Sequence, residues 1–177
     1  MPGDVVGSDI GTIYYIRSDT AFNIARARGL WEVFRMRVAG RRPYLKPFRE
    51  AVGESSLAEA CYLGVQSVVT EEIVGSLGRA REFSRNFLPV GSKTMQRERW
   101  RQSYTWLLCG KVRPPIRVCI AGGDYYVVNG HHRVSAARYL NVRAMLAHVS
   151  DIDITNVPGA GGEDRSGQPE CVAVREI

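Results

Sequence analysis

The sequence predicts an α/β fold, a small mixed sheet with helices, and three observations lead to this prediction. Short apolar runs flank a glycine-rich turn between residues 116 and 128, as in a β-hairpin. Apolar residues at helical spacing occur over residues 19–39 and again between residues 92 and 110. The chain has 177 residues, 45% of them hydrophobic, which suffices for one domain with a core and an appendage.

A helical, basic extension is expected over residues 1–60. Asp19 is a suitable N-cap for a helix that runs to about residue 39, and Gly40 is suited to end it. The apolar positions of this helix are Phe22, Leu30, Val33, Phe34 and Val38. Phe22, Trp31 and Phe34 are expected to be packing residues rather than part of a nucleic-acid surface.

The core is expected over residues 61–154, followed by a mobile tail over residues 155–177 that is rich in glycine. A strand is predicted at residues 65–69 and a charged loop at residues 70–83. The next helix opens at Ser92 or Thr94 and ends at Gly110. The remaining expected elements are the hairpin of residues 116–121 and 125–128, a helix at residues 132–140 and a strand at residues 144–149. In the helix before Gly110, Trp100, Tyr104, Leu107 and Leu108 have helical spacing, and Trp100 and Trp106 are core candidates.

The formal net charge of +6 is concentrated in one segment. Between Asn23 and Arg49 there are eight basic residues and one acidic residue, Glu32. Such a patch is typical either of a surface that contacts nucleic acid or of a solvated helix face. The candidate contacts to nucleic-acid phosphates are Arg35, Arg37, Arg41 and Arg42.

The sequence does not predict a membrane-spanning protein, a signal peptide, or a scaffold held by zinc or disulfides. No apolar run reaches the ~18–20 residues of a membrane helix. The N-terminal residues lack the basic start and apolar stretch of a signal peptide, so a cytoplasmic location is expected. The four cysteines, Cys61, Cys109, Cys119 and Cys171, form no CxxC pair, which argues against a zinc site or a disulfide scaffold and favours buried or idle thiols.

Residues 124–140 contain the pattern that predicts chemistry. A strand stops at Asn129-Gly130, and His131, His132 and Arg133 follow on the first turn of a helix. Free backbone N–H groups and the helix dipole favour an anion there, and Gly130 allows close approach to the backbone. Alternatively, His132 and Arg133 cap the turn and pair with a local carboxylate. Adjacent helical side chains diverge by ~100°, so a zinc site at the two histidines is not expected.

Residues 114–149 resemble the core of the ParB/sulfiredoxin superfamily, and residues 68–79 are similar to its upstream strand and loop. The resemblance covers about residues 64–151. It implies that Gly130–Arg133 takes the place of the ParB Gly-Glu-Arg-Arg box, which holds the phosphates of CTP, and that Arg79 closes the upstream loop. Sulfiredoxins carry a redox cysteine at the position of His131, so sulfiredoxin activity is not expected here.

The box is most similar to that of the ParB-like free serine kinases, which reads Asp-Gly-His-His-Arg. This chain has Asn129 in place of the aspartate, and an amide cannot accept a proton as a carboxylate does. Glu71 and Glu72 are the candidates for the upstream catalytic carboxylate that the resemblance implies. The alternative for these two residues is an exposed pair at the end of a strand.

The sequence therefore predicts a ParB-like domain that binds nucleotide phosphates, with ATP, ADP or CTP as the nucleotide and Mg²⁺ held mainly by the phosphates. The candidate nucleotide-binding residues are Arg79, Asn129, Gly130, His131, His132 and Arg133. Hydrolysis or transfer of phosphate, with Glu71 or Glu72 as base, is a further expectation. The alternatives are a DNA-associated ParB-like protein that uses the basic helix without catalysis, and a nucleotide-sensing scaffold for a protein partner.

Overall fold

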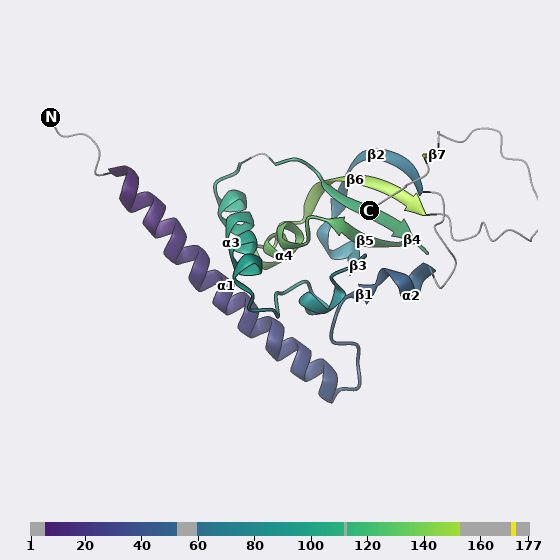
Figure 1. Ribbon diagram of the computed structural model, residues 1–177, viewed down its shortest axis with the longest axis horizontal. Coiled ribbons are helices and arrows are strands. Elements are labelled where there is room, and N and C mark those ends of the chain that lie inside the picture. Colours follow the sequence, from purple (N-terminus) through teal and green to yellow (C-terminus); the bar gives the residue numbers. More distant parts are fainter. Residues whose placement is uncertain (1–5, 53–59, 112, 153–170, 173–177) are drawn as a thin grey trace, which may run out of the picture. The chain divides into compact units, whose positions relative to one another are not determined.

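The computed structural model describes residues 6–52, 60–111, 113–152 and 171–172 (Figure 1). Its helices are α1 (Val6–Val38), α2 (Phe48–Val52), α3 (Thr94–Leu108) and α4 (His131–Tyr139), with short 3-10 turns at Thr70–Glu72 and Ala80–Glu82. Its strands are β1 (Lys46–Pro47), β2 (Ala60–Val69), β3 (Ile73–Ser76), β4 (Ile116–Ala121), β5 (Asp124–Asn129), β6 (Ala144–Ile152) and β7 (Cys171–Val172). The predicted α/β fold, a mixed sheet with helices, is confirmed.

The chain divides into two compact units that do not follow its order. The helical unit consists of Met1–Tyr44, Arg81–Arg113 and His132–Val142, and the sheet unit consists of Leu45–Ala80, Pro114–His131 and Arg143–Ile177. The predicted division at residues 60 and 154 stays a prediction, because residues 53–59 and 153–170 lie outside the described residues. The predicted mobile tail at residues 155–177 also lies largely outside them.

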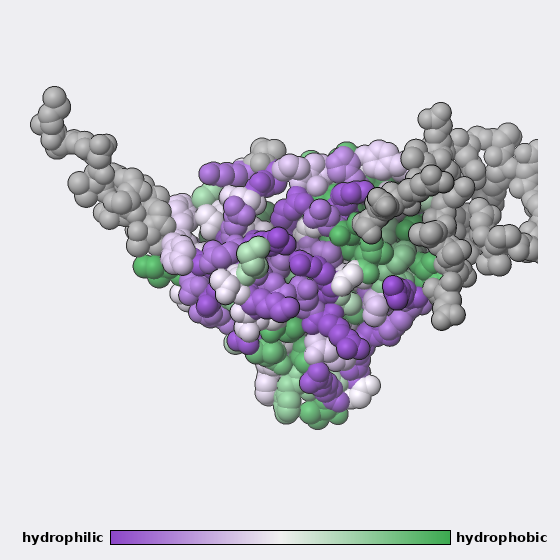
Figure 2. All heavy atoms as spheres, in the orientation of Figure 1, coloured by the Kyte–Doolittle hydropathy of each residue, from purple (hydrophilic) through white to green (hydrophobic). Residues whose placement is uncertain are grey.

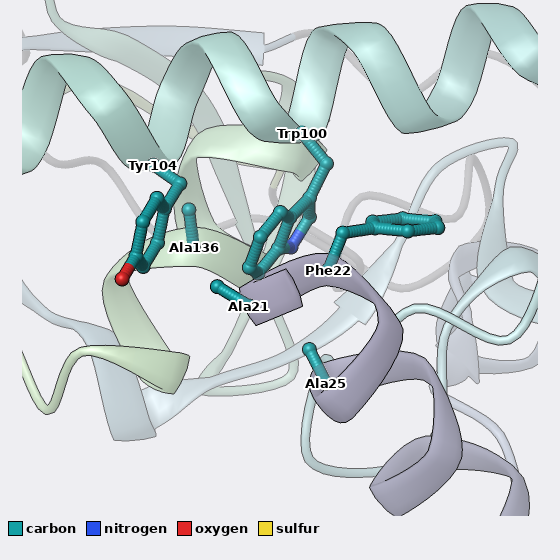
Figure 3. Packing of buried hydrophobic residues seen from close by; sticks show 6 residues of the cluster. All are labelled: Ala21, Phe22, Ala25, Trp100, Tyr104 and Ala136. Carbon is teal, nitrogen blue, oxygen red and sulfur yellow. The ribbon is translucent and has the colours of Figure 1, made fainter. Parts of the chain in front are cut away.

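Trp100 is at the centre of the helical unit. Its side chain is fully buried and packs edge-on against Phe22 of α1, with 5.6 Å between the ring centroids. Figure 3 shows Trp100 and Tyr104 extending from α3 toward α1, which contributes Ala21, Phe22 and Ala25, with Ala136 of α4 beside them. The Trp100 Nε1–H donates to Ser135 Oγ at 2.9 Å, so the one polar atom of this buried ring is satisfied.

The predicted start of α1 at Asp19 is wrong, because the helix begins at Val6. Asp19 lies within the helix, and its carboxylate forms an ion pair with Arg97 Nε of α3 at 3.1 Å. An acid that is typical of an N-cap is therefore used for a contact between helices. The end of α1 is as expected: Gly40 has a φ of +64°, and the Arg41 N–H donates to the Met36 carbonyl at 2.8 Å.

The expectation that Phe22, Trp31 and Phe34 all pack in the core is correct for Phe22 only. Phe22 is 2% exposed, whereas Trp31 is 64% and Phe34 is 58% exposed. Val33 is buried as the helical spacing suggested, but Leu30 and Val38 are exposed. The apolar residues of α1 thus occupy two faces of the helix, and only one of them is buried.

In the described part of the sheet unit, seven strands lie in the order β1-β3-β5-β4-β6-β2-β7. The predicted hairpin is present: β4 pairs with β5 in antiparallel fashion, and Gly122 and Gly123 form its turn with φ values of +58° and +82°. Two positive φ values in sequence fit a two-residue hairpin turn and favour glycine at both positions. Strand β4 also pairs in parallel with β6, and β5 pairs in parallel with β3.

Two strands differ from the prediction. Strand β2 begins at Ala60 rather than residue 65, and it pairs with β6 along its length. Strand β3, Ile73–Ser76, lies in the segment that was predicted to be a loop. Its four residues are too few to show an alternating pattern, and it forms because β1 and β5 supply hydrogen-bonding partners on both of its edges.

Candidate functional site

The turn between β5 and α4 has the backbone geometry that the motif predicted. Asn129 is the last residue of β5 and is exposed, and His131 is the first residue of α4. Gly130 between them has a φ of +109°, a conformation that residues with a Cβ rarely adopt. The chain therefore reverses from strand to helix at a glycine, and the first N–H groups of α4 are those that a helix leaves without intrahelical partners.

His131 links this turn to the end of β3. The imidazole is buried, and its Nε2 lies 2.7 Å from the Ser76 hydroxyl oxygen. Ser76 Oγ also accepts the backbone N–H of Arg79 at 2.9 Å. Because that hydroxyl oxygen already accepts one hydrogen bond, its own proton is suitably placed for donation to His131 Nε2. The cluster of Ser76, Arg79 and His131 thus joins the loop after β3 to the start of α4.

The parallel pairing of β3 with β5 explains this meeting. Val127 faces Ser76 in the register, and the Leu77 N–H donates to the Val127 carbonyl at 3.0 Å. Parallel strands end at the same edge of a sheet, so the residues after Ser76 and those after Val127 emerge together. The structure accordingly brings Arg79, Asn129, Gly130 and His131, four of the six predicted nucleotide-binding residues, to one edge of the sheet unit.

The other two predicted residues continue along α4 in the helical unit. The His132 ring packs edge-on against Phe83, with 5.6 Å between centroids, and its side chain is buried. Arg133 is half-buried. Its burial lowers the pKa of its guanidinium, and the nearby positive charge of Arg113 lowers it further. With His131 bonded to Ser76 and His132 packed on an aromatic ring, the Arg133 side chain and the backbone N–H groups are the groups of this turn best suited to an anion.

Glu71 and Glu72 are not brought to this turn. Both are exposed on the 3-10 turn Thr70–Glu72, which precedes β3, and Ile73 at the start of that strand faces Tyr125. At ~3.3 Å per residue, the four steps from Tyr125 to Asn129 cover about 13 Å. The two carboxylates therefore lie at the opposite end of β3 and β5 from Gly130. Their predicted catalytic role stays a prediction.

Asp124, another acidic residue of this sheet, also lies at the far end of β5. It is the first residue of that strand, and its carboxylate forms an ion pair with Lys46 Nζ at 2.6 Å. The position and the ion pair both separate this carboxylate from the turn at Gly130.

Ser76 is the residue that the sequence analysis missed. Residues 70–83 were predicted to be a loop, and among them only Glu71, Glu72 and Arg79 were considered for a role at the motif. The short apolar run Ile73-Val74 ahead of Gly75 is the pattern that could have indicated a short strand here. A strand at that point would have put the hydroxyl of Ser76 at the same edge as the motif.

The four candidate nucleic-acid arginines do not form one continuous stripe. Arg35 and Arg37 are exposed in the last turn of α1, and Arg41 and Arg42 are exposed beyond Gly40. Two helical positions that are two residues apart differ by ~200° in direction, so Arg35 and Arg37 lie on different sides of α1. Arg37 also donates a hydrogen bond to the Tyr44 hydroxyl at 2.7 Å.

Cys61, Cys109 and Cys119 lie in three different environments. Cys119 is buried, Cys61 is partly buried and Cys109 is exposed, and burial raises the pKa of Cys119 to about 12. In the pairing of β2 with β7, Cys171 is opposite Cys61. Among the described residues, no three histidine, cysteine or acidic side chains are grouped so that they could hold a metal ion. Nor does any described helix have the length and apolar character needed to cross a membrane.

Comparison with known proteins assigns no family to the chain. No protein-family model matches the sequence. A search of curated protein sequences also gives no match. Among solved structures, the fold is similar to that of a sulfiredoxin from Arabidopsis thaliana, with 20% sequence identity and a TM-score of 0.36 over 48% of this chain and 82% of that one.

Proposed function

We propose that the chain binds the phosphates of a nucleotide at the turn Gly130–Arg133. The observation that carries this proposal is the positive φ of Gly130 immediately before the first turn of α4. A glycine there leaves no Cβ between a ligand and the backbone, and the helix start presents N–H groups and a positive partial charge to an anion. Two hydrogen bonds support the proposal, because they brace the loop beside this turn: Ser76 Oγ bonds to His131 Nε2, and it accepts the backbone N–H of Arg79.

The electrostatic state of Arg133 also supports an anionic ligand. Its charged form is disfavoured by burial and by the positive charge of Arg113. A phosphate group would compensate for both effects, because it supplies negative charge and acceptor oxygens that match the two-pronged geometry of a guanidinium.

The nucleotide in this proposal is ATP, ADP or CTP with Mg²⁺ held by the phosphates, in line with the resemblance of the box to those of ParB proteins and ParB-like serine kinases. Coordination through phosphate oxygens is typical of Mg²⁺ and does not need a protein cluster of acidic ligands. Binding is proposed here without transfer of phosphate. Asn129 replaces the acid of the kinase box, and Glu71 and Glu72 lie at the other end of β3.

Thermal unfolding of the full chain with a panel of ligands tests this proposal. A nucleotide at 100 times its Kd should stabilise the folded state by about 2.7 kcal/mol, which raises the unfolding temperature by roughly 5–10 °C. The panel includes ATP, ADP, CTP and inorganic triphosphate, each with Mg²⁺. A rise with nucleotides and triphosphate indicates recognition of the phosphates, whereas an unchanged unfolding temperature in every case would contradict the proposal.

Nucleic-acid binding by the arginines at the end of α1 is the second candidate function, because Arg35, Arg41 and Arg42 are exposed. If they contact phosphates of duplex DNA, the binding constant should fall steeply with salt, with a log–log slope of about −0.9 for each phosphate contacted. Weak binding is expected, because these residues do not share one face. Filter binding or anisotropy over a range of salt concentrations measures the slope, and a flat response would leave the arginines as a solvated surface.

A further inference from the structure

Helix α1 has a second apolar face, which is exposed. Its buried face contributes Phe22, Ala25 and Val33 to the interior of the helical unit. On another side of the helix, a row of exposed residues, named here the outer seam, consists of Ile24, Ala27, Trp31, Phe34 and Val38. Ile24 is 42%, Trp31 is 64%, Phe34 is 58% and Val38 is 75% exposed. Figure 2 shows hydrophobic side chains gathered at the lower tip of the view, where Figure 1 places the C-terminal end of α1.

The spacing of the outer seam is that of a helix-packing surface. Successive members are three, four, three and four residues apart, which is the a/d pattern of a heptad repeat. Fourteen residues separate the first member from the last, so the seam extends about 21 Å along the helix. A strict a/d stripe is narrow and fits one partner helix, whereas a helix that lies in a membrane interface presents a wider apolar face.

Trp31 and Phe34 form a rigid anchor at the middle of the seam. Their rings are stacked, with 5.6 Å between centroids and an interplanar angle of 28°. Large exposed aromatic side chains that already contact each other lose little conformational freedom when a partner covers them. Tryptophan is also among the residues that contribute most to protein–protein binding, which makes this pair the expected centre of an interface.

The charges beside the outer seam identify the kind of partner. Arg28 and Arg35 occupy the e positions on one side, and Arg37 occupies a g position on the other. The acidic residue of this segment, Glu32, is buried on the inner face, where it accepts a hydrogen bond from the Ser84 hydroxyl at 2.7 Å. A second copy of α1 would place arginine against arginine. A helix with acidic residues beside its apolar stripe would instead pair with these arginines.

We propose that the outer seam of α1 binds an acidic amphipathic helix of another protein. The partner helix has about four turns of contact, apolar residues at heptad spacing and Asp or Glu at the flanking positions. The apolar stripe provides the contact area, and the arginines select an acidic partner over a basic one or a second copy. This inference is independent of the phosphate site, because none of its residues belongs to the turn Gly130–Arg133.

Three labelled peptides test the inference with the full chain. Each has leucine at a and d over about six turns (~21 residues), with Glu, Gln or Lys at the e and g positions. We expect the Glu peptide to bind about tenfold more tightly than the Gln peptide, and the Lys peptide not to bind, as measured by fluorescence anisotropy. Added salt should reduce the difference between the Glu and Gln peptides.

The variants Trp31→Ser and Phe34→Ser are expected to abolish binding of the Glu peptide without lowering the unfolding temperature, because both side chains are exposed. Met95→Ser is the matched control, since Met95 of α3 is 66% exposed and lies outside the seam. Absence of binding, or equal binding of the Glu and Gln peptides, would overturn the inference. It would also be overturned by sedimentation showing a dimer that Trp31→Ser dissociates, or by anionic vesicles that retain the wild type but not this variant.

Discussion

Replacing Arg133 by alanine should weaken nucleotide binding by about 1.5–3 kcal/mol, which is roughly a 10- to 150-fold rise in Kd. The side chain is half-buried close to the positive charge of Arg113, so its loss removes the pairing group that an incoming phosphate would engage. Arg133→Lys should recover only part of the affinity, because an ammonium group cannot form the two parallel hydrogen bonds of a guanidinium. Isothermal titration of each variant with the nucleotide selected by the thermal panel measures the change.

Glu72→Gln provides the matched control for this prediction. Glu72 is exposed and lies at the opposite end of β3, so its substitution should leave the Kd unchanged. If Arg133→Ala binds nucleotide as well as the wild type does, the phosphate site is not at this turn. If Glu72→Gln weakens binding as much as Arg133→Ala does, the ligand contacts the other end of the strand and the assignment to the turn is wrong.

Replacing Trp100 by alanine should lower the free energy of unfolding by about 3–5 kcal/mol, the cost of removing a large aromatic side chain from a packed core. Trp100 is fully buried among Phe22, Tyr104 and Tyr139, and the substitution also leaves the Ser135 hydroxyl without its indole donor. The unfolding temperature should fall by roughly 6–20 °C. Urea unfolding followed by circular dichroism measures the free-energy change.

Trp31→Ala is the control for the packing argument, because Trp31 lies on the same unit but is 64% exposed. Its substitution should change the free energy of unfolding by no more than about 0.5 kcal/mol. A loss at Trp31 that equals the loss at Trp100 would mean that the outer seam is covered in the isolated chain, contrary to the structure.

Local signals predicted several elements correctly because the responsible interactions lie within a few residues. Gly122 and Gly123 fixed the hairpin, since a two-residue turn requires positive φ values that glycine supplies. Gly40 and Gly110 marked the ends of α1 and α3 for the same conformational reason. The turn at Gly130 belongs with these cases, and its strand-to-helix geometry was predicted from the local pattern of a β-run, Asn-Gly and a basic helix start.

The two candidate carboxylates show what local reasoning left open. Their position next to a strand was consistent with the sequence, but the end of the sheet at which they lie depends on which strand pairs with which and in what register. Strand β3 was not predicted at all, because its four residues acquire their conformation from β1 and β5 on either side. The partnership of Ser76 with His131 was missed for the same reason.

The α/β class, the hairpin, the C-terminal ends of α1 and α3 and the glycine turn before α4 could all be predicted from the residues alone, since each depends on backbone preferences of neighbouring residues. Which side of α1 is buried could not be predicted in this way. Both faces of that helix are apolar, so periodicity could not distinguish Phe22, which packs on Trp100, from Trp31 and Phe34, which remain exposed. A side chain of α1 is buried only where another element packs against it. The packing of α3 and α4, rather than the residues of α1, decides where that happens.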